Sequence, residues 1–243
     1  MKKEIDVDSF FDPERVYMLK HKNDPEEHRT SQFSALWRLA RFVSWQESDQ
    51  GVSRLNAVLE GGNGSPIPSM PFNEGFWVSS KLQAVVLYLM LLDLLSAIFP
   101  DLGKVKSKKG DPKPDTNGII RMLREAHSPL SDVEMQAVKI LRHTLAHNFG
   151  LASTNIVSKN PPPLHRFTLV HSKENHSKEV IIPTTPASQN YGIGDEEMQT
   201  VINVPLLIEY IEGTINKIVA DKKSVGFKGI IGNDELRVRF TTI

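Results

Sequence analysis

The feature that most constrains the fold is an apolar run in the first half of the chain, from Phe76 to Phe99. A membrane span needs about 20 apolar residues with few charges, and this run is interrupted by Lys81, Gln83 and Asp93. We therefore predict a helix that is buried on nearly every side. Such a helix forms the centre of a helical bundle, or half of a subunit interface.

Asp93 is the one carboxylate inside this apolar run. A carboxylate on a buried helix is destabilising unless a cation or hydrogen bonds compensate it, or unless it takes up a proton. Two structural explanations are open: Asp93 lies on a solvated edge of the helix, or it pairs with Arg121 or Arg124. The functional alternative is that Asp93 orients Arg142.

Composition limits the kinds of function that the chain can have. The 243 residues include 29 basic and 29 acidic side chains. This charge balance argues against a large surface that binds nucleic acid nonspecifically, but it allows an enzyme that contacts only a few nucleotides. The absence of cysteine excludes disulfides, zinc–thiolate sites and cysteine nucleophiles. The first eight residues lack the basic and apolar regions of a signal peptide, so we expect a cytoplasmic protein.

Apolar residues at helical spacing predict further helices on both sides of the apolar run. Their expected ranges are a short helix within residues 1–30, Gln32 to Trp45, Val52 to Leu59, Asn117 to His127, Val133 to about Asn148, and Val201 to Ala220. The glycine-rich segment Gly61 to Pro66 lacks the ending of a P-loop and is interpreted as a connector. The lysine-containing loop from Pro100 to Pro114 either steers an RNA backbone by charge or is a solvated connection.

Two β-prone segments, Arg166 to Val170 and Glu179 to Ile182, predict a hairpin at about residues 165–183. Residues 184–200 are expected to form a loop, and the alternating segment Leu236 to Thr241 an edge strand. The sequence therefore predicts a mainly α fold, a helical up-and-down bundle with a small β-hairpin and strand appendage. We expect a helical extension over residues 1–70 and the bundle over residues 71–243.

The predicted helix that starts near Val133 carries the candidate site in its last two turns, Leu141 to Asn148. A capping box, Ser131 to Glu134, marks its start. Arg142 keeps its charge and can hold a phosphate, whereas His143 and His147 can exchange protons near neutral pH. An arginine and a histidine are sufficient for cleaving RNA without a metal.

Helical geometry separates these side chains around the axis. At about 100° per residue, His143 and His147 lie together on one edge of the apolar stripe, whereas Arg142 lies roughly 140° from His147. A single helix would therefore not place Arg142 and His147 over one small group. Two copies of the helix about a twofold axis can do so, which favours a composite site in a dimer.

Two other interpretations of the same residues are open. Cations near a helix C-terminus are favoured by the helix dipole, which would make Arg142 and the histidines structural. His143 and His147, four residues apart, would also make a bidentate metal pair. A metal site would also need a third ligand. The candidates are Asp93, His127, His165, His171 and His176, and none of them lies at a spacing from the histidine pair that is diagnostic of a metal site.

The segment Arg142 to His147 resembles the Arg-x4–6-His signature of HEPN domains, in which a polar residue commonly follows the arginine. His143 fills that position here. The helical setting and the acidic residue Asp93 on an earlier apolar helix are similar too, and the resemblance covers roughly residues 75–220. It implies a helical bundle of the HEPN type and a metal-independent endoribonuclease that acts as a homodimer without a cofactor.

The resemblance also implies a role for each residue. His147 would transfer the proton when the ribose 2′-hydroxyl attacks the adjacent phosphate, Arg142 would stabilise the phosphate charge, and His143 would assist. Asp93 and Asn148 would support the site. Many HEPN proteins belong to defence or toxin–antitoxin systems, where a cognate inhibitor protein is expected. Others have lost activity and serve only as binding or dimerisation modules, which is the alternative here.

Overall fold

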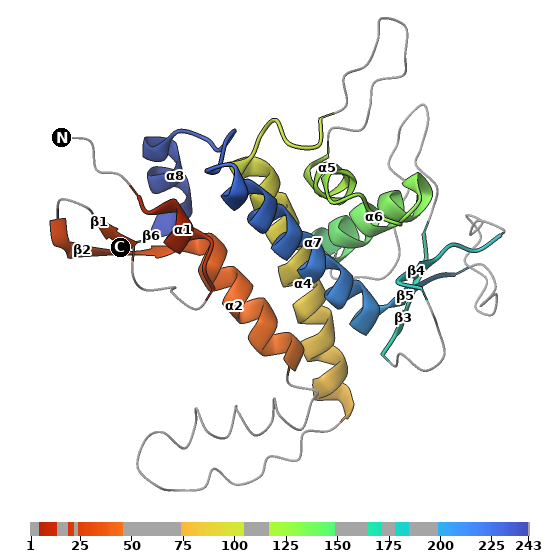
Figure 1. The fold of residues 1–243 in the computed structure, drawn as a ribbon. Coiled ribbons are helices and arrows are strands. Elements are labelled where there is room, and N and C mark those ends of the chain that lie inside the picture. Colours follow the sequence, from red (N-terminus) through yellow and green to blue (C-terminus); the bar gives the residue numbers. More distant parts are fainter. Residues whose placement is uncertain are drawn as a thin grey trace, which may run out of the picture. The chain divides into compact units, whose positions relative to one another are not determined.

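The computed structural model describes residues 5–13, 19–21, 24–45, 74–104, 117–148, 165–171, 178–184 and 199–242 (Figure 1). Contacts divide the chain into two units, one formed by Met1–Tyr88 with Asn233–Ile243 and the other by Leu89–Gly232. The division falls inside helix α4 (Glu74–Ile98). The predicted boundary at residue 70, the helix at residues 52–59 and the connector at residues 61–66 lie outside the described residues.

The first unit combines helices with a three-stranded sheet. Its helices are α1 (Val7–Phe10), α2 (Gln32–Trp45), the first part of α4, and α8 (Asn233–Phe240), and its strands are β1 (Leu19–His21), β2 (Asp24–Ser31) and β6 (Thr241–Thr242). The strands pair antiparallel in the order β1-β2-β6. The range predicted for α2 is confirmed. The strands β1 and β2 were not predicted, because residues 1–70 were expected to be a helical extension.

The edge strand predicted for Leu236 to Thr241 is wrong. The segment up to Phe240 is helix α8, and only Thr241 and Thr242 are extended. An edge strand would put Leu236, Val238 and Phe240 on one face, but Leu236 and Phe240 are buried whereas Val238 is 79 % exposed. This is helical spacing, and acidic residues in the first turn with arginines in the last turn suit a helix dipole.

The second unit contains the rest of α4 and three further helices. These are α5 (Gly118–Glu125), α6 (Asp132–Asn148) and α7 (Val204–Ser224), together with strands β3 (Phe167–Val170), β4 (Val180–Ile181) and β5 (Thr200–Asn203). The predicted helices at α4, α5 and α6 are confirmed. Within this unit α5 packs against both α6 and α7 (Figure 1). The described part of the chain is therefore mainly helical, as predicted.

The predicted hairpin is also wrong, because its two strands do not pair with each other. The sheet has the order β3-β5-β4, with β5 parallel to β3 and antiparallel to β4. The sequence predicts a loop up to residue 200 and a helix from Val201, so the central strand β5 is not predicted. That helix, α7, begins at Val204 instead of Val201, because the Asn203 side chain caps its first turn by accepting from Leu206 N at 3.2 Å.

The prediction that the central run is a helix buried on nearly every side is only partly confirmed by α4, in which Gln83 and Met90 are exposed. Its segment Lys81–Ile98 is the one described helix that is long and apolar enough to cross a membrane, by length and composition. Half of that segment is buried inside the protein. A core helix has the same properties, and α4 contributes fully buried side chains in both units, among them Tyr88 and Leu92.

Candidate functional site

The candidate site is built on α6, whose start is fixed by the predicted capping box. The Ser131 hydroxyl and backbone N–H both donate to Oε2 of Glu134 at 2.7 Å, and the Glu134 N–H donates back to Ser131 Oγ at 3.3 Å. The helix then continues without a break to Asn148. All three candidate catalytic residues therefore lie in its last two turns, as predicted.

The last turns of α6 have one buried side. Leu141, Thr144 and Leu145 are buried, His143 is exposed, and Arg142 is half-buried at the edge between them. The backbone of His147 and Asn148 belongs to the final turn, but their side chains lie outside the described residues. Because the α6 backbone is continuous, helix geometry puts positions 142 and 147 roughly 140° apart around its axis.

Arg142 forms an ion pair with Asp93 of α4. Its Nε atom lies 2.8 Å from Oδ2 of Asp93, and each side chain is about one-third exposed at 32 % and 30 %. Of the cations considered as partners for Asp93, Arg142 is the one that the structure shows. Arg124 instead contacts Asp132 at 3.1 Å, and Arg121 is bound to main-chain carbonyls.

Two opposing effects act on the protonation of Asp93. Burial raises the pKa of its carboxyl, and the charge of Arg142 opposes that rise. Both the charge of Arg142 and a side-chain hydrogen bond from it lower the pKa of Asp93, and the charge has the larger effect. The Asp93 carboxylate is therefore partly desolvated, and the neighbouring charge of Arg142 stabilises its ionised form.

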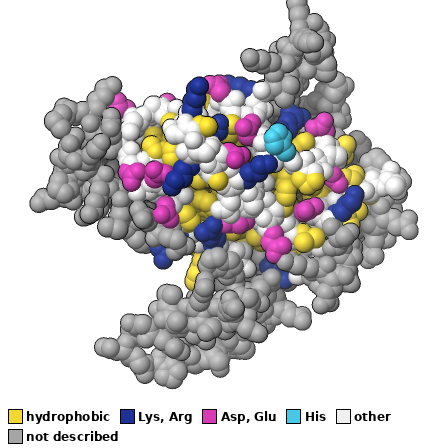
Figure 2. All heavy atoms as spheres, in the orientation of Figure 1, with side chains coloured by type: hydrophobic (Ala, Val, Ile, Leu, Met, Phe, Trp, Pro, Cys, Tyr) yellow, Lys and Arg dark blue, Asp and Glu magenta, His cyan; other side chains and the backbone are white. Residues whose placement is uncertain are grey.

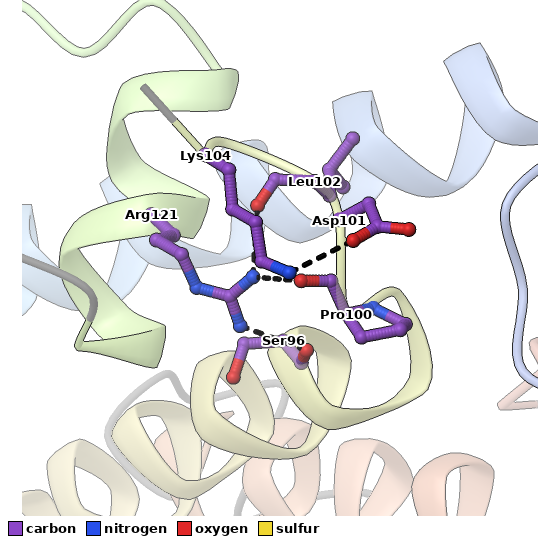
Figure 3. A network of polar contacts seen from close by, with 6 residues as sticks. All are labelled: Ser96, Pro100, Asp101, Leu102, Lys104 and Arg121. Carbon is purple, nitrogen blue, oxygen red and sulfur yellow. Dashed lines mark hydrogen bonds and ion pairs between the residues drawn. The ribbon is translucent and has the colours of Figure 1, made fainter. Parts of the chain in front are cut away.

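Arg121 of α5 is a buried cation with a structural role (Figure 3). Its guanidinium donates to the main-chain oxygens of Ser96 at 3.0 Å, Pro100 at 2.5 Å and Leu102 at 3.1 Å. These carbonyls belong to the C-terminal end of α4 and the turn after it, where a helix leaves its last carbonyl groups without intrahelical partners. Arg121 therefore fixes the end of α4, close to Asp93.

Two residues beside Asp93 were not singled out from the sequence. Ser96 lies three residues further along α4, and its buried hydroxyl donates to the Asp93 main-chain oxygen at 2.7 Å. Gly118 begins α5 and comes close to both residues. No local pattern marks either of them, because their importance depends on how α5 packs on α4.

The described surface gives little support for steering by charge. Lys104, the one lysine of the predicted basic loop within the described residues, pairs with Asp101 at 2.8 Å. The other lysines of that loop lie outside the described part of the chain. On the face shown in Figure 2, acidic and basic side chains are interspersed.

The described histidines do not assemble a metal site. Among the residues that the structure describes, no group of three or more His, Asp or Glu could hold a metal ion. His165 is buried, with Nδ1 2.9 Å from Oγ1 of Thr200 and its ring stacked on Phe167. Burial lowers the pKa of His165, which suits a neutral core residue. The side chains of His147 and His176 lie outside the described residues, so the proposed histidine pair stays untested.

The chain has no significant match among models of protein families, among curated proteins or among solved structures. Inference about its function therefore starts from the side chains where α4, α5 and α6 meet.

Proposed function

We propose that this protein is a metal-independent endoribonuclease of the HEPN type that acts as a homodimer. The observation that carries the proposal is the ion pair between Arg142 and Asp93. It holds a permanently charged, partly exposed guanidinium in the helix that also contains His143 and His147. A half-buried carboxylate in contact with the arginine would keep a phosphate-binding guanidinium in one position between rounds of binding.

The proposed reaction uses the 2′-hydroxyl of RNA as the nucleophile. His147 removes the 2′-hydroxyl proton, the oxygen attacks the adjacent phosphorus, and the bond from phosphorus to the 5′-oxygen breaks. The 5′-oxygen takes a proton from water as it leaves, giving a 2′,3′-cyclic phosphate and a 5′-hydroxyl, and His147 returns its proton to the hydroxide left behind. Arg142 stabilises the negative charge that develops on the phosphate. His143, exposed beside Arg142, assists in holding the phosphate.

Asp93 and Asn148 support this site in different ways. Asp93 limits the positions that the Arg142 guanidinium can take, because the two charged groups are in contact at 2.8 Å. Asn148 is the last residue of α6 and lies next to His147. In this proposal Asn148 caps the C-terminus of α6 and so stabilises its final turn. The backbone position of His147 is thereby maintained.

The proposed dimer follows from the positions of the two catalytic residues on the α6 backbone. Arg142 and His147 are five residues apart on one continuous helix and so diverge by roughly 140°. A second copy related by a twofold axis brings the His147 of one protomer to the Arg142 of the other. Each dimer then has two equivalent composite sites.

A second candidate is a noncatalytic binding or dimerisation module of the same type. The observation that favours it is again the ion pair, because a half-buried arginine that is already neutralised by Asp93 also suits a purely structural role. RNA as substrate and a defence setting with a cognate inhibitor protein belong to the first candidate only, whereas a cytoplasmic location is proposed for both.

The deciding experiment incubates the purified chain with a fluorescent RNA and follows the cleavage products by gel. We expect cleavage that EDTA leaves unchanged, ending in a 2′,3′-cyclic phosphate, and no cleavage by His147→Ala. The matched control is His127→Asn, which alters an exposed histidine outside the site. His127 has a φ of 55°, a left-handed conformation that asparagine tolerates.

Binding assays separate the two candidates. A wild-type protein that is folded and dimeric, and that binds RNA or a protein but cuts no RNA, supports the noncatalytic module. Activity that is lost in EDTA and restored by zinc would contradict the metal-independent mechanism and favour the histidine pair as a metal site.

A further inference from the structure

Gly118, the first residue of α5, lies close to Ser96 and Asp93 of α4. A Cβ atom on Gly118 would lie 2.1 Å from Oγ and 2.9 Å from Cβ of Ser96, and 3.3 Å from Oδ1 of Asp93. The first two distances are far inside van der Waals contact, which for carbon atoms is optimal at about 3.5–4.0 Å. Only a residue without a side chain fits here with the helices in their present positions.

Ser96 cannot move aside to make this space. Its hydroxyl is bound to the Asp93 main-chain oxygen at 2.7 Å, and its own main-chain oxygen accepts a hydrogen bond from Arg121 of α5 at 3.0 Å. Rotation about the Cα–Cβ bond would relocate Oγ but not Cβ, which is attached to the backbone. The α5 helix is therefore held on α4 at Ser96 from two positions one turn apart, Gly118 and Arg121.

The same close approach limits the Asp93 carboxylate. Its Oδ1 atom borders the empty Cβ position of Gly118, and its Oδ2 atom lies 2.8 Å from Nε of Arg142. The carboxylate thus lies between α5 on one side and α6 on the other. Because its two oxygen atoms are rigidly connected, displacing Oδ1 from the α5 side also moves Oδ2 relative to Arg142.

We propose that Gly118 is a positioning residue for Arg142, acting through the Asp93 carboxylate. The missing side chain at residue 118 lets α5 close onto Ser96 and Asp93, which leaves Oδ2 where it holds the guanidinium. The consequence for RNA cleavage rests on the proposed function of Arg142. The effect of Gly118 on the contact between Asp93 and Arg142 does not.

The first test compares Gly118→Ala with Gly213→Ala. Gly213 lies on α7 with open space around its Cβ position, so its substitution is a matched change without a clash. The readout is the titration of the Asp93 carboxyl carbon by NMR. Arg142 lowers the pKa of Asp93, so a loosened contact raises it. We expect Gly118→Ala to shift the titration upward, in the direction of Arg142→Gln, and Gly213→Ala to leave it in place.

The second test restores the space from the α4 side. In the double variant Gly118→Ala/Ser96→Gly both atoms that clash are removed, and the nearest remaining neighbour is Asp93 Oδ1 at 3.3 Å. We expect the Asp93 titration to return toward that of a Ser96→Gly reference. RNA cleavage should fall about 10²-fold in Gly118→Ala, the loss typical of a misplacement by about 1 Å, and should recover in the double variant.

The outcomes separate this proposal from the proposed function. An unchanged Asp93 titration in folded Gly118→Ala overturns the positioning role, whether or not the protein cleaves RNA. A shifted titration in a protein that cuts no RNA supports the positioning role and contradicts the ribonuclease. If Gly118→Ala does not fold, the double variant decides. A folded double variant with the reference titration supports the proposal, and one that also fails to fold overturns it.

Discussion

The Nε atom of Arg142 on α6 lies 2.8 Å from Oδ2 of Asp93 on α4. This contact explains how an otherwise apolar helix carries a carboxylate in a half-buried position. It also gives Arg142 a fixed partner inside the protein, so a bound phosphate would meet a guanidinium that is already oriented. Substitutions at Arg142 and Asp93 can therefore distinguish a purely structural ion pair from one that positions a catalytic arginine.

Mixing the variants Arg142→Ala and His147→Ala tests whether the proposed catalytic site is composite. In a heterodimer of Arg142→Ala with His147→Ala, one of the two composite sites keeps both residues, so we expect about half of the wild-type cleavage per dimer. The measurement is RNA cleavage by heterodimers purified with two different affinity tags. Neither homodimer should be active.

A second heterodimer provides the control for that test. When the wild-type chain is paired with the double variant Arg142→Ala/His147→Ala, every composite site lacks one residue, so this heterodimer should be inactive. A site built within one protomer gives the opposite pattern, with activity in the second heterodimer and none in the first. That pattern would rule out the composite arrangement.

The ionisation of Asp93 predicts a specific dependence of stability on pH. Burial raises the pKa of Asp93 above its value in the unfolded chain, and Arg142 reduces that rise. A raised pKa means that the folded state binds the proton more tightly than the unfolded state. This contribution to stability is present below the unfolded-state pKa of about 3.9 and is lost as the pH rises through the folded-state pKa.

Urea unfolding of the wild type and of Asp93→Asn measures this contribution, because asparagine does not titrate. We expect the free energy of unfolding of the wild type to fall relative to that of the variant as the pH rises from about 4. Replacing Arg142 by glutamine should enlarge the fall, since Arg142 lowers the pKa of Asp93. A relative stability that rises with pH would mean that Arg142 outweighs burial.

The parts of the fold that could be predicted from the sequence are those determined by neighbouring residues. The capping box of Ser131 and Glu134 marks a helix start by itself, and the helical spacing in α2 and α5 needs no distant partner. Strand pairing does need one. The sheet order β3-β5-β4 places a strand from residues 200–203 between two segments that precede it in the chain, which no local pattern indicates.

The candidate site shows the same limit. The sequence marked Arg142 and Asp93 as charged residues in apolar helices and left three arginines as partners for Asp93. Packing decides among them, because the two terminal nitrogen atoms of Arg121 donate to carbonyl oxygens at the end of α4. Gly118 was not identified, since the need for glycine arises only from Ser96 on another helix.

The capping box gives a prediction for the start of α6. Replacing Ser131 by alanine removes the hydroxyl that contacts both the carboxylate and the N–H of Glu134. We expect a loss of about 1 kcal/mol in the free energy of unfolding, which is typical of removing an N-cap side chain. Thermal and urea unfolding measure the loss, and Ser131→Thr, which keeps a hydroxyl that can both donate to Glu134 and accept from its N–H, should restore most of it. An unchanged stability in Ser131→Ala would show that the box contributes nothing to the fold.

The end of α4 should depend strongly on Arg121. Replacing Arg121 by alanine removes the donors that satisfy the main-chain oxygens of Ser96, Pro100 and Leu102. Each buried acceptor that is left unsatisfied costs roughly 1–3 kcal/mol of stability. Hydrogen bonds from a charged donor are among the stronger ones. Because the chain can relax and admit water, we expect a total loss of about 3 kcal/mol in the free energy of unfolding.

Arg124→Ala is the matched control for that measurement. Arg124 is on the same helix, but its ion pair is with Asp132, whose side chain is 77 % exposed. Exposed ion pairs contribute about 0–1 kcal/mol, so Arg124→Ala should change stability much less than Arg121→Ala. Arg121→Lys keeps the charge but loses the planar fork that reaches several carbonyls, and it should recover only part of the loss. Equal effects of Arg121→Ala and Arg124→Ala would contradict the role of Arg121 in fixing the end of α4.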